Sequence, residues 1–75
     1  MKIKIGGNYK HYKNHNLYKV IAIAKDCESL QDIVVYEALY PHPLSRVWVR
    51  PYHEWTEGVT NEKGETVPRF SLIED

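Results

Sequence analysis

Two stretches in the middle of the chain alternate strongly enough between apolar and polar side chains to predict strands. Within residues 17–25 one face is entirely apolar, and the opposite face is half apolar, with two isoleucines between two lysines. Because successive side chains of a strand point to opposite faces, this pattern is typical of a central strand that is covered on both sides. The fully apolar face is expected to hold Tyr18, Val20, Ala22 and Ala24.

Residues 32–40 predict the strongest strand, since β-branched and aromatic side chains favour extended backbone. Pro41 and Pro43 end it, because proline cannot donate to a strand ladder. Residues 46–50 predict a further strand, which Pro51 stops. The first of these strands places Ile33, Val35 and Leu39 on one face and Val34, Tyr36, Ala38 and Tyr40 on the other, and the second separates Val47 and Val49 from Arg46, Trp48 and Arg50.

Shorter segments complete the expected fold. Residues 9–13 predict a strand closed by a turn at 14–16, residues 26–31 a polar loop, and residues 52–55 a tight element. A turn at 61–64 precedes a last segment, 65–73, which Pro68 interrupts. About five short strands without a long helical period favour a mostly β fold, either a small antiparallel barrel or a strongly curved sheet. An SH3-like barrel is preferred; an OB-like barrel and a small α+β sheet remain alternatives.

Length and composition place the chain among small globular proteins. Its 75 residues form one expected domain, 1–75, and its 43% hydrophobic and 27% charged residues are ordinary for a folded protein. The single cysteine, Cys27, excludes an intramolecular disulfide and favours a reducing cytoplasm. No apolar run is long enough for secretion or for crossing a membrane, so we expect a cytoplasmic protein without a membrane partner.

The charges balance in number but not in position. Ten basic and ten acidic side chains give a formal net charge of zero, which removes the simplest argument for nucleic-acid binding. Residues 1–25, however, contain six lysines and no carboxylate, whereas residues 51–75 contain six carboxylates. A basic face therefore stays open as an alternative, depending on how the strands interleave.

Several blocks, in this order along nearly the whole chain, resemble a bacterial family of domains of unknown function, family 1653. They are Gly7-x-Tyr9-x-His11-Tyr12-Lys13, Tyr18-x-Val20, Ala24, Val34-Val35-Tyr36-x-x-Leu39-Tyr40, Trp48-Val49-Arg50-Pro51 and Val67-Pro68-Arg69-Phe70. The sequence departs from the family's pattern at 26–29 and 41–45, and Trp55 stands where a phenylalanine is usual. The resemblance implies a small stand-alone bacterial domain and carries no catalytic residues to transfer.

No motif predicts a catalytic or metal site. The four histidines lack the spacing of a zinc site, with neither HExxH nor CxxC to fix a geometry. Cys27 lies between two carboxylates, which disfavour the thiolate that a nucleophile needs. Gly6 and Gly7 are not followed by the lysine and hydroxyl residue of a phosphate-binding loop. We therefore expect no catalytic residue, no metal and no cofactor, and keep a small enzyme using His11 as the minority alternative.

Aromatic and cationic side chains interleave in two segments, around residues 9–13 and 46–52. Such a surface suits peptide docking or base stacking, since rings stack on prolines or nucleobases while cations meet carboxylate or phosphate. The structural alternative is that the rings fill the core and that the arginines pair with Glu54 or Glu57. The residues predicted to bind a ligand are Tyr9, His11, Tyr12, Lys13, Tyr36, Trp48, Arg50 and Arg69.

The favoured function is a non-catalytic module that holds a peptide or protein partner on this surface. A nucleic-acid binder would combine the same rings with the lysines of the first 25 residues. The sequence leaves open whether the protein is a monomer or a weak homo-oligomer.

Overall fold

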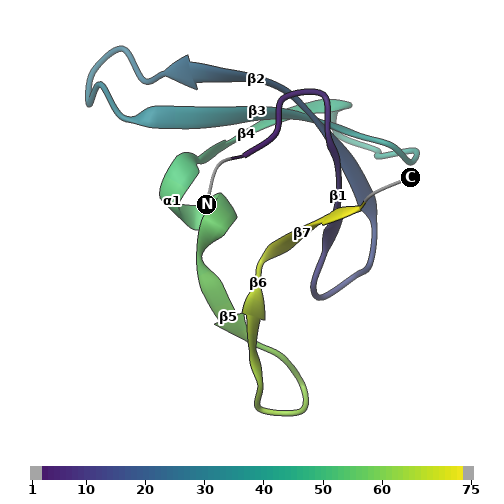
Figure 1. Ribbon diagram of the computed structural model, residues 1–75. Helices are drawn as coiled ribbons and strands as arrows, with labels where there is room; N and C mark the ends of the chain where they lie inside the picture. Colours follow the sequence, from purple (N-terminus) through teal and green to yellow (C-terminus); the bar gives the residue numbers. More distant parts are fainter. Residues whose placement is uncertain (1–2, 74–75) are drawn as a thin grey trace.

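The chain folds into one open antiparallel sheet with a short helix and a separate hairpin (Figure 1). The computed structural model describes residues 3–73. Five strands pair in the order β4-β3-β2-β1-β7, and β5 pairs only with β6. The elements are β1 (Asn8–His11), β2 (Leu17–Lys25), β3 (Asp32–Ala38), β4 (Val47–Pro51), α1 (Tyr52–Thr56), β5 (Gly58–Thr60), β6 (Thr66–Pro68) and β7 (Phe70–Ile73).

The sheet does not close into a barrel. Its edge strands, β4 and β7, have no pairing with each other among residues 3–73. Between them the chain forms α1, which packs on β3 and β4, and the β5–β6 hairpin, so a helix rather than a strand ladder covers this side of the core. The SH3-like barrel, preferred over a strongly curved sheet, is therefore not confirmed within residues 3–73, where no closed barrel forms. The mostly β, antiparallel fold is confirmed, with a five-stranded sheet and a two-stranded hairpin that together make seven strands instead of about five.

The alternation predicted for β3 is confirmed. Val34, Tyr36 and Ala38 are buried, and the residues between them are only partly covered. Strand β2 follows its prediction through Tyr18 and Val20, and then its register shifts between Val20 and Ala22. After this bulge Ile23, rather than Ala22 or Ala24, lies opposite Val34 and packs on the core, because one extra residue in a strand reverses the faces that follow.

The outer face of the sheet is less covered than the sequence predicts. Ile21, at the bulge, is 43% exposed, and Val49 on β4 is 64% exposed. Strand β2 is central, as predicted, but it is not buried on both sides. On β4 the buried side instead belongs to Trp48 and Arg50, which lie opposite Tyr36 and Val34 on β3.

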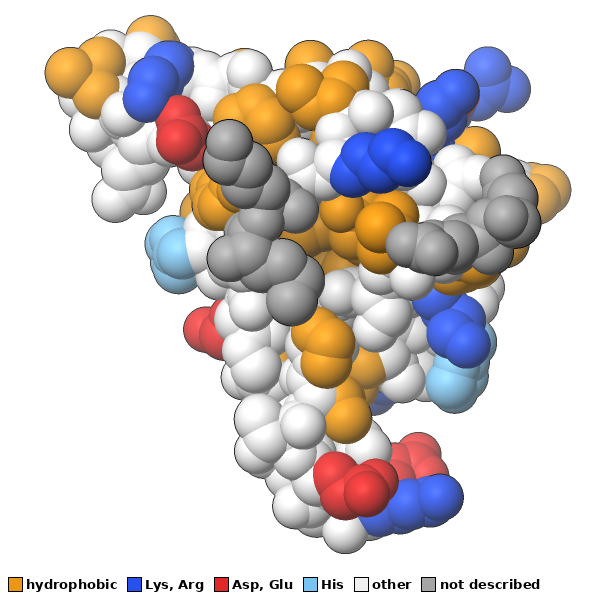
Figure 2. Space-filling model, viewed as in Figure 1, with side chains coloured by type: hydrophobic (Ala, Val, Ile, Leu, Met, Phe, Trp, Pro, Cys, Tyr) orange, Lys and Arg blue, Asp and Glu red, His pale blue; other side chains and the backbone are white. Residues whose placement is uncertain are grey.

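The β5–β6 hairpin is held by one asparagine. The carboxamide oxygen of Asn61 accepts the backbone N–H groups of Lys63 and Glu65 at 2.9 and 3.0 Å, and Gly64 takes a positive φ of 78° that suits a residue without Cβ. The turn predicted at 61–64 is therefore confirmed. Acidic and basic side chains meet at its tip (Figure 2). No helix within residues 3–73 is long and apolar enough to cross a membrane.

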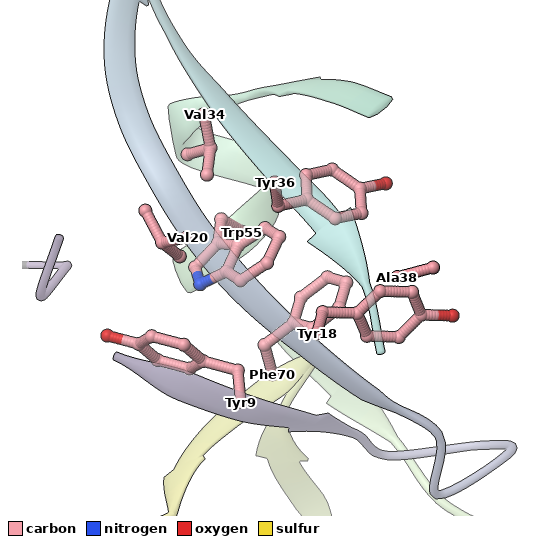
Figure 3. Packing of buried hydrophobic residues seen from close by; sticks show 8 residues of the cluster. All are labelled: Tyr9, Tyr18, Val20, Val34, Tyr36, Ala38, Trp55 and Phe70. Atoms are coloured by element: carbon pink, nitrogen blue, oxygen red, sulfur yellow. The ribbon is translucent and has the colours of Figure 1, made fainter. Parts of the chain in front are cut away.

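The core is mostly aromatic (Figure 3). Helix α1 begins after Pro51, whose fixed φ suits a helix start, and it carries Trp55, which is 1% exposed, into the centre. The Trp55 ring stacks on Phe70 with centroids 3.7 Å apart, and the rings of Tyr9 and Tyr36 meet it edge-on at 5.4 and 4.9 Å. The whole core comprises Tyr9, Tyr18, Val20, Val34, Tyr36, Ala38, Trp55 and Phe70.

Candidate functional site

Phe70 links the core to a group of polar and aromatic side chains. One face of its ring stacks on Trp55, while the His11 ring meets it edge-on at 4.9 Å. The Cζ atom of Arg50 lies 5.7 Å from the Phe70 centroid. Strands β1 and β7 bring His11 directly opposite Phe70, so residues from opposite ends of the chain meet here.

A row of neighbouring rings extends from Tyr18 through Tyr40 and His42 to Trp48. The Tyr18 and Tyr40 hydroxyl groups lie 2.8 Å apart, and burial together with this hydrogen bond raises the pKa of Tyr18 to about 12. The Tyr40 and His42 rings lie 5.8 Å apart, and the His42 and Trp48 rings 4.7 Å apart. The Trp48 indole N–H donates to the Ser45 carbonyl at 3.0 Å, which holds the indole in place.

Together these side chains form one continuous surface, which we call the aromatic-arginine face. Its floor is Tyr18, Tyr36 and Phe70, which are buried and mutually in contact, with centroids 5.5 to 6.0 Å apart. Its half-buried rim consists of His11, Tyr40, His42, Trp48, Arg50 and Arg69.

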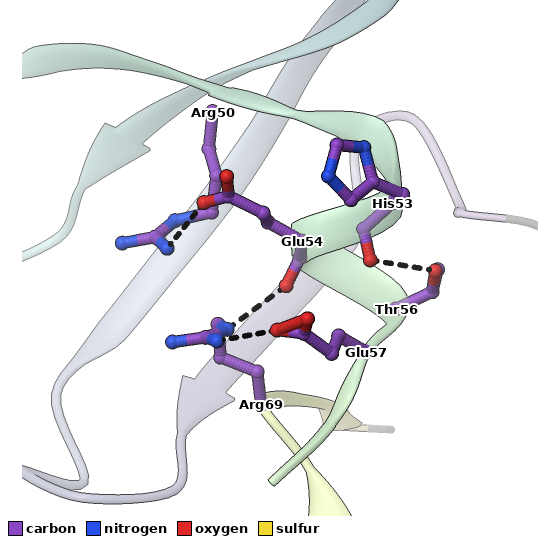
Figure 4. Close-up of polar contacts among 6 residues, drawn as sticks. All are labelled: Arg50, His53, Glu54, Thr56, Glu57 and Arg69. Carbon is purple, nitrogen blue, oxygen red and sulfur yellow. Dashed lines mark hydrogen bonds and ion pairs between the residues drawn. The ribbon is translucent and has the colours of Figure 1, made fainter.

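Arg50 and Arg69 both bind helix α1, and Arg69 also binds Glu57, the residue after it (Figure 4). An Arg50 Nη1 group donates to a Glu54 carboxylate oxygen at 3.3 Å. Arg69 donates from Nε to the Glu54 carbonyl at 2.9 Å and from Nη2 to the Glu57 carboxylate at 2.7 Å. These contacts fasten the helix to the sheet, so the structural role considered for both arginines is present.

Each guanidinium group also has N–H groups left over. Arg50 Nε is buried and has no hydrogen-bond partner within residues 3–73. In Figure 4 the remaining ends of the Arg50 and Arg69 guanidinium groups point the same way, away from α1. An arginine carries five N–H donors in a planar fork, and the contacts with α1 use only some of them.

His11 adds another donor. Its Nδ1 accepts the Lys13 backbone N–H at 3.2 Å, which leaves Nε2 as the protonated nitrogen of the neutral ring. Burial lowers the pKa of His11, and so do the nearby charges of Arg50, Arg69 and Lys13. The neutral imidazole, offering one N–H, is therefore favoured.

The residues predicted from the sequence to bind a ligand lie in different parts of the structure. His11, Trp48, Arg50 and Arg69 lie in the rim of the aromatic-arginine face, and Tyr36 lies in its floor. Tyr9 is instead part of the core, where its hydroxyl accepts the Lys4 backbone N–H at 2.9 Å.

Tyr12 and Lys13 line a neighbouring cleft of about 590 Å³, between the β1–β2 turn and the β5–β6 hairpin. The opposite wall carries acidic and basic side chains, including Glu62 and Lys63, and His11 is not among the lining residues. The Tyr12 and His11 rings lie 5.1 Å apart, so the cleft adjoins the aromatic-arginine face.

Four residues of the face were not predicted to be part of a site: Tyr18, Tyr40, His42 and Phe70. The alternation of residues 32–40 already placed Tyr40 beside Tyr36, which was the available signal. Tyr18 and His42 join only through tertiary contacts.

Within residues 3–73, no three His, Cys, Asp or Glu side chains are grouped so that they could hold a metal ion. Cys27 is exposed in the β2–β3 turn. There the Asp26 carboxylate accepts the backbone N–H groups of Ser29 and Glu28, which lower its pKa. These contacts shape the turn.

Comparison with known proteins gives a family and a structural relative. The crystal structure of a DUF1653 protein from Bordetella bronchiseptica superposes with a TM-score of 0.82 and 29% sequence identity, covering 91% of this chain and 85% of that one. No curated protein matches the sequence. The family described as "Protein of unknown function (DUF1653)" matches residues 7–72, which include every residue of the aromatic-arginine face, and the chain therefore belongs to this family.

Proposed function

We propose that the protein is a non-catalytic binding module whose aromatic-arginine face holds a peptide segment of a partner protein. The observation that supports this most directly is the row of half-buried rings, Tyr40, His42 and Trp48, beside the cationic rim. The core buries five other aromatic rings, and Tyr40 and Trp48 pack against it while staying half-buried, so part of each ring remains open to a partner. Grooves lined with exposed aromatic rings are a common way to bind extended peptides.

The distribution of lysines favours a peptide over a nucleic acid. The rings of Tyr9 and Tyr18 point into the core, so their strand neighbours Lys10 and Lys19 lie on the opposite, outer face of the sheet. Lys25 forms an ion pair with Asp32 at 2.7 Å. On the side shown in Figure 2 the basic side chains are separated from one another. Single-stranded nucleic acids need cations and stacking rings along one groove, and this arrangement divides them.

The contacts of His11 favour binding over catalysis. A general acid or base needs a pocket in which a substrate can reach it, usually with a second group to orient it. His11 does not line the neighbouring cleft, and its Nδ1 is engaged by the Lys13 backbone. The ring is thus placed to donate one hydrogen bond at a surface.

The proposal is tested by selecting peptides from a random twelve-residue display library on the immobilised protein. An enriched peptide is then titrated into the nitrogen-15-labelled protein. We expect amide shifts centred on Tyr40, Trp48 and Phe70. Trp48→Ala should weaken binding at least tenfold, whereas Val49→Ala, the adjacent residue on the outer face, should leave it within twofold.

Failure of any peptide to be enriched above the starting library would overturn the proposal. So would shifts confined to the outer face of the sheet. The same labelled protein, titrated with a mixed single-stranded oligonucleotide pool at low and high salt, tests the alternative. Salt-reversible shifts on the aromatic-arginine face would support a nucleic-acid ligand instead.

A further inference from the structure

The rim around Phe70 presents several hydrogen-bond donors whose capacity the contacts with α1 do not exhaust. Arg50 and Arg69 each retain N–H groups that α1 does not use, and neutral His11 offers Nε2–H. His11 and Arg50 lie against one ring, Phe70, and the charges of Arg50 and Arg69 lower the pKa of His11, so the three groups are electrostatically close. Such a set is complementary to an anionic acceptor.

From this we infer that the bound peptide presents the carboxylate of an Asp or Glu side chain to Arg50 and Arg69, next to an apolar or proline residue on the rings of Tyr40, His42 and Trp48. This inference rests on the proposed function and adds the chemistry of the ligand. Guanidinium and carboxylate groups are both planar and form paired hydrogen bonds, which makes arginine well suited to this acceptor.

The local charge favours a single negative charge over a phosphate. Glu54 and Glu57 lie against Arg50 and Arg69 and offset their two positive charges, and Lys13 is a further cation near His11. A doubly charged phosphate would be repelled by both carboxylates. A carboxylate carries half that charge and can still take the unused N–H groups.

Partial burial strengthens the interaction. The side chains of Arg50 and Arg69 are 28% and 22% exposed, so they are less screened by water than surface arginines such as Arg46, at 78%. The Arg50 Nε atom is already withdrawn from solvent without a partner. A ligand carboxylate near Arg50 therefore meets a cation that water solvates poorly.

An acidic side chain suits the site better than a chain terminus. The rings of Tyr40, His42 and Trp48 continue the face on one side of Arg50, and on the other side His11 leads to Tyr12 and the neighbouring cleft. A peptide can therefore continue past the arginines in both directions. An internal residue fits this open arrangement.

The test uses an enriched library peptide, made with an amidated C-terminus, and isothermal titration of the wild-type protein. We expect enriched peptides to share an Asp or Glu within three residues of a proline or aromatic residue. Replacing that residue by Asn or Gln should weaken binding roughly 10- to 100-fold, the range for a hydrogen bond to a charged group. Because the protein is unchanged, this result does not depend on the folding of a variant.

Protein variants locate the contact. Arg50→Gln should weaken binding of the acidic peptide roughly 10-fold or more and have little further effect on the amide variant of the peptide. Arg46→Gln is the matched control, since Arg46 pairs with Glu37 at the start of the same strand and should leave affinity within twofold. Arg50→Lys keeps the charge without the planar fork and should give intermediate affinity.

Three results would overturn the inference. If the enriched peptides lack acidic residues, or bind equally well when Asp or Glu is replaced by its amide, a ligand carboxylate is not required. The proposed function would still stand. If a peptide with a free C-terminus binds ten times more tightly than its amidated form, the carboxylate belongs to the peptide terminus and not to a side chain. Absence of any enriched peptide would remove both the inference and the proposed function.

Discussion

Replacing Trp55 by phenylalanine should cost the protein little, although Trp55 is the largest fully buried side chain. Its indole Nε1 is buried without a hydrogen-bond partner within residues 3–73. A buried, unsatisfied N–H group costs about 1–3 kcal/mol, and phenylalanine has no such group.

The opposing cost comes from lost volume. Phenylalanine lacks three heavy atoms of the indole, equivalent to two or three methylene groups at about 0.8 kcal/mol each, or about 2 kcal/mol. A phenyl ring still stacks on Phe70. The two effects nearly cancel, so the free energy of unfolding should change by less than about 1 kcal/mol. Trp55→Ala removes the whole ring and should cost roughly 3–5 kcal/mol.

Urea unfolding followed by far-ultraviolet circular dichroism measures both variants. A domain of this size has a total stability of about 4–11 kcal/mol, so Trp55→Ala should remove from about a quarter to all of it while Trp55→Phe keeps most of it. Trp48→Phe is the matched control, because the Trp48 N–H is already satisfied by the Ser45 carbonyl. A loss above about 2 kcal/mol for Trp55→Phe would refute the assignment of Trp55 Nε1 as an unsatisfied donor.

Three further perturbations test other parts of the structure. Because the pKa of His11 is lowered below 6.5, the contribution of its neutral ring to stability is present above pH 6.5 and is lost as the pH falls below that value. His11→Gln should therefore lose less stability than the wild-type protein on acidification. An equal loss for the two proteins in urea titrations would contradict this. Arg69→Gln removes one hydrogen bond to α1 and one to Glu57, the residue after it, and should cost about 2 kcal/mol, with faster amide exchange in the helix, whereas unchanged exchange would count against the anchor. Leu30 is exposed with φ of 63°, so Leu30→Gly should raise the thermal midpoint by relieving roughly 1 kcal/mol of strain, and a lower midpoint would show that the backbone is unstrained there.

The sequence predicted the fold correctly where the alternation of apolar and polar side chains allows one assignment of the two strand faces. In β3 the two faces alternate without interruption, so the grouping of Tyr36 with Val34 and Ala38 on one face is confirmed. In β2 both faces are apolar after Val20, so the side-chain pattern does not show whether a bulge is present or which face then turns to the core. The register with β3, rather than the alternation itself, decides that Ile23 faces the core.

Strand β4 shows the same limit in the candidate site. Val47 and Val49 are the more apolar pair, yet Trp48 and Arg50 face inward, because they lie opposite Tyr36 and Val34. Sequence alternation groups Trp48 with Arg50 but does not say which side the sheet covers. The position of Phe70 depends on pairing between β1 and β7, at opposite ends of the chain, which no local pattern encodes.

Phe70 also links the proposed binding to folding in a single equilibrium. Its ring is packed on Trp55 at one side and touches the donor groups of the rim at the other, so the rim exists only while the core is assembled. A molecule that binds only the folded form at one hundred times its Kd adds about 2.7 kcal/mol to the free energy of unfolding. For a domain this small that corresponds to roughly 11–22 °C in Tm. The melting temperature of the unlabelled protein is thus a direct readout of occupancy.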